Sequence, residues 1–186
     1  MKIVILNGPN LNLLGRREPA VYGTRSMEQV LVDIQRTYPE VYFEYRQSNH
    51  EGDLIDWVQN YGLACLEARG EEARVAGIIL NAGGYTHTSV ALRDAVACSR
   101  VPVVEVHISD ITQREEFRRV SLLTDVCAHS IIGHGTDGYK EAVEWILERV
   151  ESRDKRVDEK NIKIHIMLGD VVGDWTSTCT KQPLCG

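Results

Sequence analysis

A glutamate and a histidine two residues apart are the first candidates for chemistry in this sequence. Glu105 and His107 lie in the run VPVVEVHIS, residues 101–109. Alternate residues of a strand point to the same face, so we expect the two side chains to lie together. A carboxylate beside an imidazole can orient the ring for general acid catalysis, although a buried histidine with a purely structural hydrogen bond is the common alternative.

A second apolar run, GIILNAGGYTHTS at residues 77–89, also ends in polar side chains. Asn81 is placed where the strand is expected to end, and His87 precedes a predicted helix whose first N–H groups attract anions. A tight turn capped by Thr88 or Ser89 would explain the same residues without any function.

The loop after the first apolar run is unusually long. It covers residues 8–25, GPNLNLLGRREPAVYGTR, whereas most strand-to-helix connections have about 2 to 6 residues and longer ones often bind ligands. The loop contains Arg17 and Tyr22, and a neighbouring arginine lowers the pKa of a tyrosine from its usual value near 10. Tyr22 could therefore act as a base, or it could simply pack the loop down while the arginines are solvated.

Further anion-binding groups are expected after residue 107. The backbone N–H groups of Ile108 and Ser109 could clamp a carboxylate, and Arg114 and Arg118 follow in the segment REEFRR. The two arginines could equally form an exposed, ion-paired helix face. Ligands of open parallel sheets bind beyond the carboxyl ends of the strands, so we expect these groups and Asn10 to converge there.

The hydrophobic pattern predicts the elements that would position these residues. Short apolar runs rich in β-branched residues predict buried parallel strands, and helical spacing of apolar residues predicts the helices between them. The predicted strands are 3–6, 41–45, 77–80, 102–106 and 128–133, and the predicted helices are 26–37, a stretch after Asn49, 89–98 and 139–150. This alternation predicts an α/β fold, a three-layer flavodoxin-like sandwich with a five-stranded parallel sheet of order 2-1-3-4-5.

The composition argues against several classes of partner. A net charge of −6 disfavours nucleic-acid binding, which depends on a basic surface. No apolar stretch approaches the roughly 18 residues of a membrane span, and the run at residues 3–6 is too short for a signal-peptide core. The five cysteines, at positions 65, 98, 127, 179 and 185, show neither zinc spacing nor CxxC pairs, so we expect a reducing cytosol and no metal.

Six segments of the chain, in order and spacing, resemble the motifs of the type II 3-dehydroquinate dehydratases. They lie within residues 1–150 and are GPNLNLLGRREPAVYG, SNHEGDLIDW, NAGGYTHTSVALRDA, EVHISD, REEFRR and GHGTDGY. The resemblance implies a lyase that dehydrates 3-dehydroquinate to 3-dehydroshikimate through an enolate, in the shikimate pathway of aromatic amino acid biosynthesis. It also implies that no metal or organic cofactor is used, and that the enzyme is a cytoplasmic homododecamer, a tetramer of trimers.

The resemblance further implies a role for each candidate residue. Tyr22 would be the base, Arg17 would stabilise its phenolate, and His107 would be the acid. Glu105 would orient His107, and Asn10 would position a water near the enolate oxygen. The substrate-binding residues would be Asn81, His87, Asp94, Arg118 and the backbone of Ile108 and Ser109.

Residues 1–150 are thus expected to form a catalytic domain, and residues 151–186 a C-terminal extension without a counterpart in the family. Eight of the ten residues 151–160 are charged, which predicts a solvated linker or a frayed helix extension. The alternation in NIKIHIML, residues 161–168, predicts a strand, which could pair at a sheet edge or contact a subunit. A dispensable segment is the simpler interpretation.

Some features depart from the family or leave other functions open. NAGGY stands where many relatives have NPGAY, and His134 stands where an apolar or aromatic residue is usual, so we assign His134 no role. Asp94, in the segment ALRDA, would reach a neighbouring subunit's site. The same reaction could serve quinate catabolism, and the same architecture could form a flavodoxin-like binding module.

Overall fold

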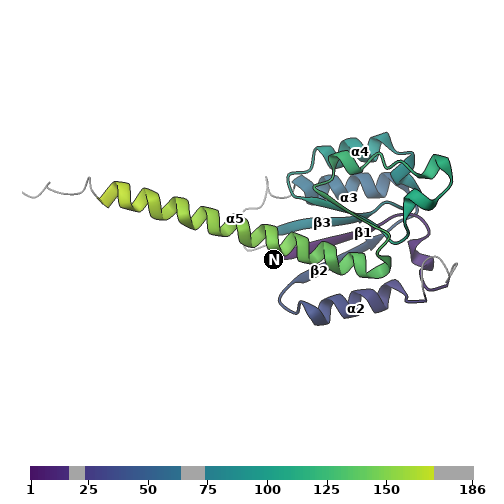
Figure 1. Ribbon diagram of the computed structural model, residues 1–186, viewed down its shortest axis with the longest axis horizontal. Coiled ribbons are helices and arrows are strands. Elements are labelled where there is room, and N and C mark those ends of the chain that lie inside the picture. Colours follow the sequence, from purple (N-terminus) through teal and green to yellow (C-terminus); the bar gives the residue numbers. More distant parts are fainter. Residues whose placement is uncertain (17–23, 64–73, 170–186) are drawn as a thin grey trace, which may run out of the picture. The chain divides into compact units, whose positions relative to one another are not determined.

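Residues 1–16, 24–63 and 74–169 are described by the computed structural model (Figure 1). The chain divides into two compact units, Met1–Glu148 and Arg149–Gly186. The first unit contains the sheet and every candidate site residue that the structure describes.

The first unit is built on a five-stranded sheet in which every strand pairing is parallel. The strands are β1 (Lys2–Asn7), β2 (Tyr42–Gln47), β3 (Val75–Asn81), β4 (Val103–His107) and β5 (His129–Ile132). Their order is β2-β1-β3-β4-β5. This confirms the predicted order and the flavodoxin-like fold.

Helices cover both faces of the sheet (Figure 1). One face packs against α2 (Met27–Thr37) and the first turns of α5 (Gly138–Gly169), and the other packs against α3 (Glu51–Leu63) and α4 (Val90–Ala97). The alternation of side chains along β1 explains the two cores, because Ile3 and Ile5 belong to the first while Val4 and Leu6 belong to the second. Burying each such side chain contributes about 1.5–3 kcal/mol.

The start of α2 shows how the local sequence sets an element boundary. The Ser26 hydroxyl accepts a hydrogen bond from the Gln29 N–H, and the Gln29 side chain accepts one from the Ser26 N–H at 2.9 Å. This capping box satisfies two N–H groups that have no partner inside the helix. It begins α2 at Met27, directly after the long loop.

The prediction of a strand at residues 161–168 is wrong. The last helix, expected at 139–150, continues as α5 to Gly169. An extra strand needs hydrogen bonds from a neighbouring strand, whereas a helix that has already formed adds one internal hydrogen bond for each further residue. Of the two interpretations of residues 151–160, a linker or a helix extension, the helix is the one observed.

Within the described ranges, none of the helices combines the length and the apolar character that crossing a membrane would require.

Candidate active site

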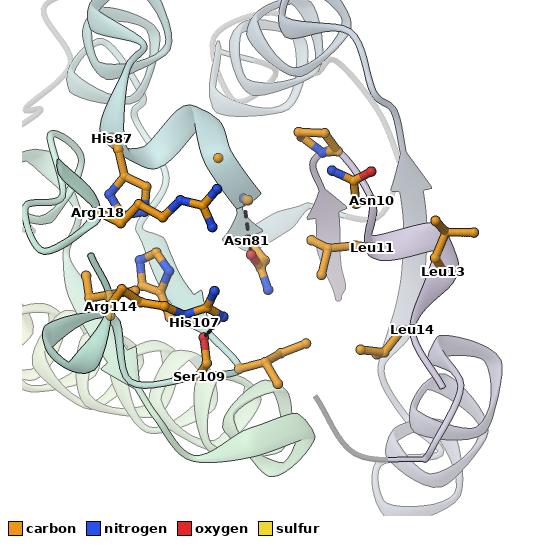
Figure 2. A pocket seen from close by; sticks show the side chains of 15 residues that line it. Asn10, Leu11, Leu13, Leu14, Asn81, His87, His107, Ser109, Arg114 and Arg118 are labelled. Carbon is orange, nitrogen blue, oxygen red and sulfur yellow. Dashed lines mark hydrogen bonds between the residues drawn. The ribbon is translucent and has the colours of Figure 1, made fainter. Parts of the chain in front are cut away.

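A pocket opens where β3 and β4 end, at the carboxyl edge of the sheet. Asn81 and His107 are the last residues of these two strands, and both line the pocket. One wall is polar and carries His87, Arg114 and Arg118. The opposite wall is largely apolar and is formed by Leu11, Leu13 and Leu14 from the turn after β1, with Asn10 above them (Figure 2).

The polar wall contains the predicted pairing of a histidine with a glutamate. Nε2 of His107 lies 2.7 Å from Oε1 of Glu105. The Glu105 side chain is completely buried and that of His107 is 6% exposed, so the contact is almost shielded from water. Glu105 itself does not line the pocket and lies behind the imidazole. A carboxylate in this place fixes the tautomer and orientation of the ring.

Glu105 is the centre of a buried hydrogen-bond network. Besides His107, four hydroxyl groups donate to its carboxylate. The donors are Thr86 (3.0 Å) and Ser121 (2.6 Å) to Oε1, and Thr124 (2.7 Å) and Ser130 (3.0 Å) to Oε2. A buried charge is tolerated when it is paired and its lone pairs accept hydrogen bonds.

The network also determines the protonation state of Glu105. Burial alone would raise the pKa of this carboxyl, but the hydrogen bonds and positive charge of His107, with the donors Ser121 and Thr124, lower it to about 2. Glu105 is therefore ionised throughout the physiological range. The His107 ring therefore lies beside a fixed negative charge.

The four hydroxyl donors were not identified from the sequence. Thr86 precedes the predicted residue His87, Ser121 and Thr124 lie in a loop after the arginines, and Ser130 is in β5. The segment SLLT, one residue after REEFRR, was a weak signal, since two hydroxyls three residues apart suit a turn. Ser121 indeed accepts hydrogen bonds from the N–H groups of Leu123 (3.0 Å) and Thr124 (3.2 Å).

The side chain of Asn81 is held by a hydrogen bond to a buried tyrosine. The amide nitrogen of Asn81 donates to the Tyr139 hydroxyl at 3.0 Å, and this hydroxyl donates to Oδ1 of Asn7 at 2.8 Å. Burial raises the pKa of Tyr139 far above its ordinary value, so the phenol stays neutral and keeps its proton for Asn7. The side-chain oxygen Oδ1 of Asn81 accepts a hydrogen bond from the Gly83 N–H at 3.3 Å. The amide of Asn81 is therefore fixed at both ends.

His87 is oriented by the loop that carries the arginines. Its Nδ1 lies 2.8 Å from the backbone oxygen of Val120. A carbonyl oxygen can only accept, so Nδ1 carries a proton and Nε2 is left for a ligand. Arg118 extends beside His87 toward the centre of the pocket, and the Arg114 guanidinium donates to the Ser109 hydroxyl at 2.8 Å (Figure 2). Two cationic groups thus face one small cavity.

Asn10 has an unusual backbone conformation. Its φ is 68°, the left-handed region that asparagine adopts more readily than most residues. Its N–H donates to the side-chain oxygen of Asn49 at 3.0 Å, which holds the turn in place. The turn directs the chain from β1 into the apolar wall of the pocket.

The structure brings most of the predicted site residues together. Those that line the pocket are Asn10, Asn81, His87, His107, Ile108, Ser109 and Arg118. Asp94 does not line this pocket. It is 71% exposed on α4, with its carboxylate 3.9 Å from Arg93. Arg17 and Tyr22 lie outside the described residues. In the described part of the chain, no group of three or more His, Cys, Asp or Glu is arranged to hold a metal ion.

The fold and this pocket define the class of protein. A flavodoxin-like sheet that collects a buried Glu–His pair, a second histidine and two arginines at its carboxyl edge has the parts of an acid–base enzyme for a small anionic molecule.

Comparisons with known proteins identify the family within this class. The model of the class II dehydroquinase family matches residues 1–147. The 3-dehydroquinate dehydratase of Exiguobacterium sp. is 48% identical over 154 residues, which are 82% of this chain and 99% of that protein. The enzyme of the same name from Halothermothrix orenii is 45% identical over 152 residues, 81% and 96% of the two chains.

A solved structure agrees with these sequence relatives. The crystal structure of type II dehydroquinase from Butyrivibrio crossotus superposes with a TM-score of 0.69 and 41% identity, covering 78% of this chain and 97% of its own. The chain therefore belongs to the class II dehydroquinase family and is an enzyme.

Proposed function

We propose that this enzyme dehydrates 3-dehydroquinate to 3-dehydroshikimate. The observation that carries the proposal is one pocket that is lined by His107, which is paired with Glu105 behind it, together with Asn81, His87 and Arg118. Removing water from a hydroxylated ring ketone requires a base, an acid and a stabiliser of the enolate around one ring. The names of the relatives support the same reaction.

The polar wall would hold the substrate. The backbone N–H groups of Ile108 and Ser109 would bind its carboxylate, and Arg118 would add a positive charge nearby. The amide of Asn81 and Nε2 of His87 would bind ring hydroxyls, because both are fixed by hydrogen bonds on their other side. Groups that are already oriented lose little entropy when the ligand binds.

The first chemical step would be the removal of a proton from the carbon next to the ketone. Tyr22 would accept this proton as a phenolate stabilised by Arg17, and the electron pair would move onto the ketone oxygen to form an enolate. Asn10 would position a water molecule near that oxygen. The roles of Tyr22 and Arg17 rest on the family resemblance, since both lie outside the described residues.

The second step would be the loss of the hydroxyl group with a proton from His107. Nε2 of His107 is held by Glu105, which leaves Nδ1 to give the proton. The enolate electrons would form the ring double bond as the C–O bond breaks, and water would leave. The ionised Glu105 would stabilise the imidazolium before the transfer and keep the ring aligned.

The biological setting is proposed on the same resemblance. The reaction would serve the shikimate pathway in the cytoplasm, although quinate breakdown uses the same step. The enzyme would be a homododecamer made of four trimers. The exposure of Asp94 on α4 is compatible with its reaching the active site of a neighbouring subunit.

The direct test is an assay with the purified protein. Adding 3-dehydroquinate should produce the ultraviolet absorbance of the conjugated product, and the rate should depend on enzyme concentration. No absorbance change at any pH would refute the proposal.

The assignment of the base can be tested with one variant and one matched control. Tyr22→Phe removes the hydroxyl, so kcat should fall by about 10²–10⁴-fold while the product still binds. Tyr42→Phe removes the same atom from an exposed tyrosine of β2 and should leave kcat unchanged. If Tyr22→Phe kept near-normal turnover, Tyr22 would not be the base.

A further inference from the structure

We propose that the loop between β5 and α5, residues 133–135, positions the two N–H groups that bind the substrate carboxylate. The inference rests on the proposed function, because it assigns the N–H groups of Ile108 and Ser109 to that carboxylate. The loop would act through these two residues and would not touch the substrate.

Two hydrogen bonds connect the loop to the end of β4. The N–H of Gly133 donates to the carbonyl oxygen of His107 at 3.0 Å, and the N–H of Gly135 donates to that of Ile108 at 2.9 Å. Successive carbonyls of an extended strand point in opposite directions. Here the chain bends after His107, and two successive carbonyls point toward the same loop.

The orientation of these carbonyls determines that of the N–H groups. The His107 carbonyl shares a peptide plane with the Ile108 N–H, and the Ile108 carbonyl shares one with the Ser109 N–H. The C=O and N–H of a trans peptide point in opposite directions, and no described peptide bond is cis. Both N–H groups are therefore turned away from the loop.

The two N–H groups belong to residues that line the pocket. Ile108 and Ser109 line it, and within the described ranges neither N–H donates to another residue. Two neighbouring N–H groups on the same side of a bent chain form an anion-binding concavity. A carbonyl that accepts a hydrogen bond also polarises its peptide, which makes the N–H on the opposite side a better donor.

The loop needs glycine at both donor positions. Gly133 has a φ of +85° and Gly135 a φ of +62°, which residues with a side chain rarely adopt. A Cβ at Gly133 would also lie 3.2 Å from Cβ of Asp110, whereas a Cβ at Gly135 would meet no atom within 4 Å. A substitution at Gly135 therefore changes the backbone preference without a clash.

His134, between the two glycines, is held from outside the pocket. Its Nδ1 lies 2.7 Å from Oε2 of Glu141 on α5. This contact ties the middle of the loop to the start of α5, and it gives a structural role to a residue to which the sequence analysis assigned none.

The test compares ligands that differ only in the carboxylate. Dissociation constants of the product 3-dehydroshikimate and of its methyl ester are measured by calorimetry for the unaltered enzyme, Gly135→Ala, Gly135→Asn and the control Gly52→Ala. Gly52 lies in the first turn of α3, where a Cβ meets nothing. Turnover of 3-dehydroquinate by the unaltered enzyme is measured first.

The expected result is a selective loss of carboxylate binding. Gly135→Ala should weaken binding of the acid about tenfold and of the ester less than about twofold. Gly135→Asn should lower the preference for the acid by at least about twofold, because asparagine adopts positive φ more readily than alanine but less readily than glycine. Gly52→Ala should match the unaltered enzyme.

Three outcomes have different meanings. Equal weakening of both ligands, or an unchanged preference for the acid in the Gly135 variants, would overturn the inference and make the loop a purely structural element. If Gly135→Ala does not fold, Gly135→Asn decides alone by the same criterion. Absence of turnover in the unaltered enzyme would instead overturn the proposed function.

Discussion

Two glutamates, on strands separated by two others in the sheet, each accept several hydrogen bonds but differ in burial and in the groups that donate them. Glu105 lies in β4 and is fully buried, whereas Glu44 lies in the edge strand β2 and is 20% exposed. Both carboxyls have a pKa below the ordinary value, despite a contribution from burial that acts in the opposite direction. The difference is in the kind of partner.

Glu44 is neutralised by full cations. Lys2 lies 3.2 Å and Arg46 2.8 Å from its oxygens, and the Tyr61 hydroxyl donates to it as well. The Arg46 guanidinium also lies over the rings of Trp57 and Tyr61, so the group forms a compact surface cluster. The negative charge of Glu44 is neutralised by the two cations of this cluster.

The partners of Glu105 are four neutral hydroxyls and one imidazole. Hydroxyls stabilise a carboxylate without cancelling its charge, so the charge acts on His107. A lowered pKa therefore marks a stabilising surface cluster in one case and a candidate catalytic pair in the other. The surrounding partners, and not the shift itself, distinguish the two.

The largest expected effect is on turnover in Glu105→Gln. Glutamine has nearly the same shape but no charge, and its amide nitrogen faces hydroxyls that donate to the native carboxylate. His107 then loses its counter-charge and its fixed orientation, so kcat should fall by about 100-fold or more with a smaller change in KM. Steady-state kinetics with 3-dehydroquinate measures both. A kcat within a few-fold of the unaltered enzyme would remove Glu105 from the chemistry.

The second effect is a pH-dependent contribution of Glu105 to stability. Its pKa is about 2 in the folded chain against 4.5 for an ordinary glutamate, so the stabilisation is complete above pH 4.5 and is lost as the pH falls toward 2. It is on the order of 3 kcal/mol at neutral pH. Urea unfolding of the unaltered enzyme and of Glu105→Gln should show a difference in the free energy of unfolding at pH 7, and this difference should be smaller at pH 3. A difference in the free energy of unfolding that grows on acidification would contradict the lowered pKa of Glu105.

The smallest effect is expected for Glu44→Gln, which is also the matched control for Glu105→Gln. Partly exposed ion pairs contribute about 0–1 kcal/mol, so the free energy of unfolding should change by less than about 1 kcal/mol. kcat and KM should be unchanged, since Glu44 does not line the pocket. Comparable losses in the two variants would show that the two carboxylates do not differ in role.

The fold was largely predictable because its signals are local. Apolar runs with β-branched residues marked the strands, and the capping box at Ser26 marked the start of α2. The alternation of strands and helices then left few topologies, because crossovers between parallel strands are right-handed. The error at residues 161–168 arose where an alternating pattern was present without a partner strand.

The candidate site was most directly predictable where a residue stands at the end of a strand. Asn81 and His107 are such residues, and Glu105 was found from its spacing to His107. The four hydroxyls around Glu105 come from three segments of the chain that only the complete fold brings together. The apolar wall was missed because leucines in a loop look the same in the sequence whether they face a core or a ligand. Gly133 and Gly135 could be recognised in the sequence as turn residues, but the carbonyl groups that accept their hydrogen bonds could not be predicted from it.

The left-handed backbone of Asn10 limits which residues can ever occupy that position. Glycine would keep the turn but remove the amide, and a β-branched residue would not tolerate the positive φ. Aspartate would fit the turn but bring a negative charge toward the mouth of a cavity that contains two arginines. In a library that randomises this codon, very few members should therefore survive selection for activity, even though the side chain is exposed to solvent.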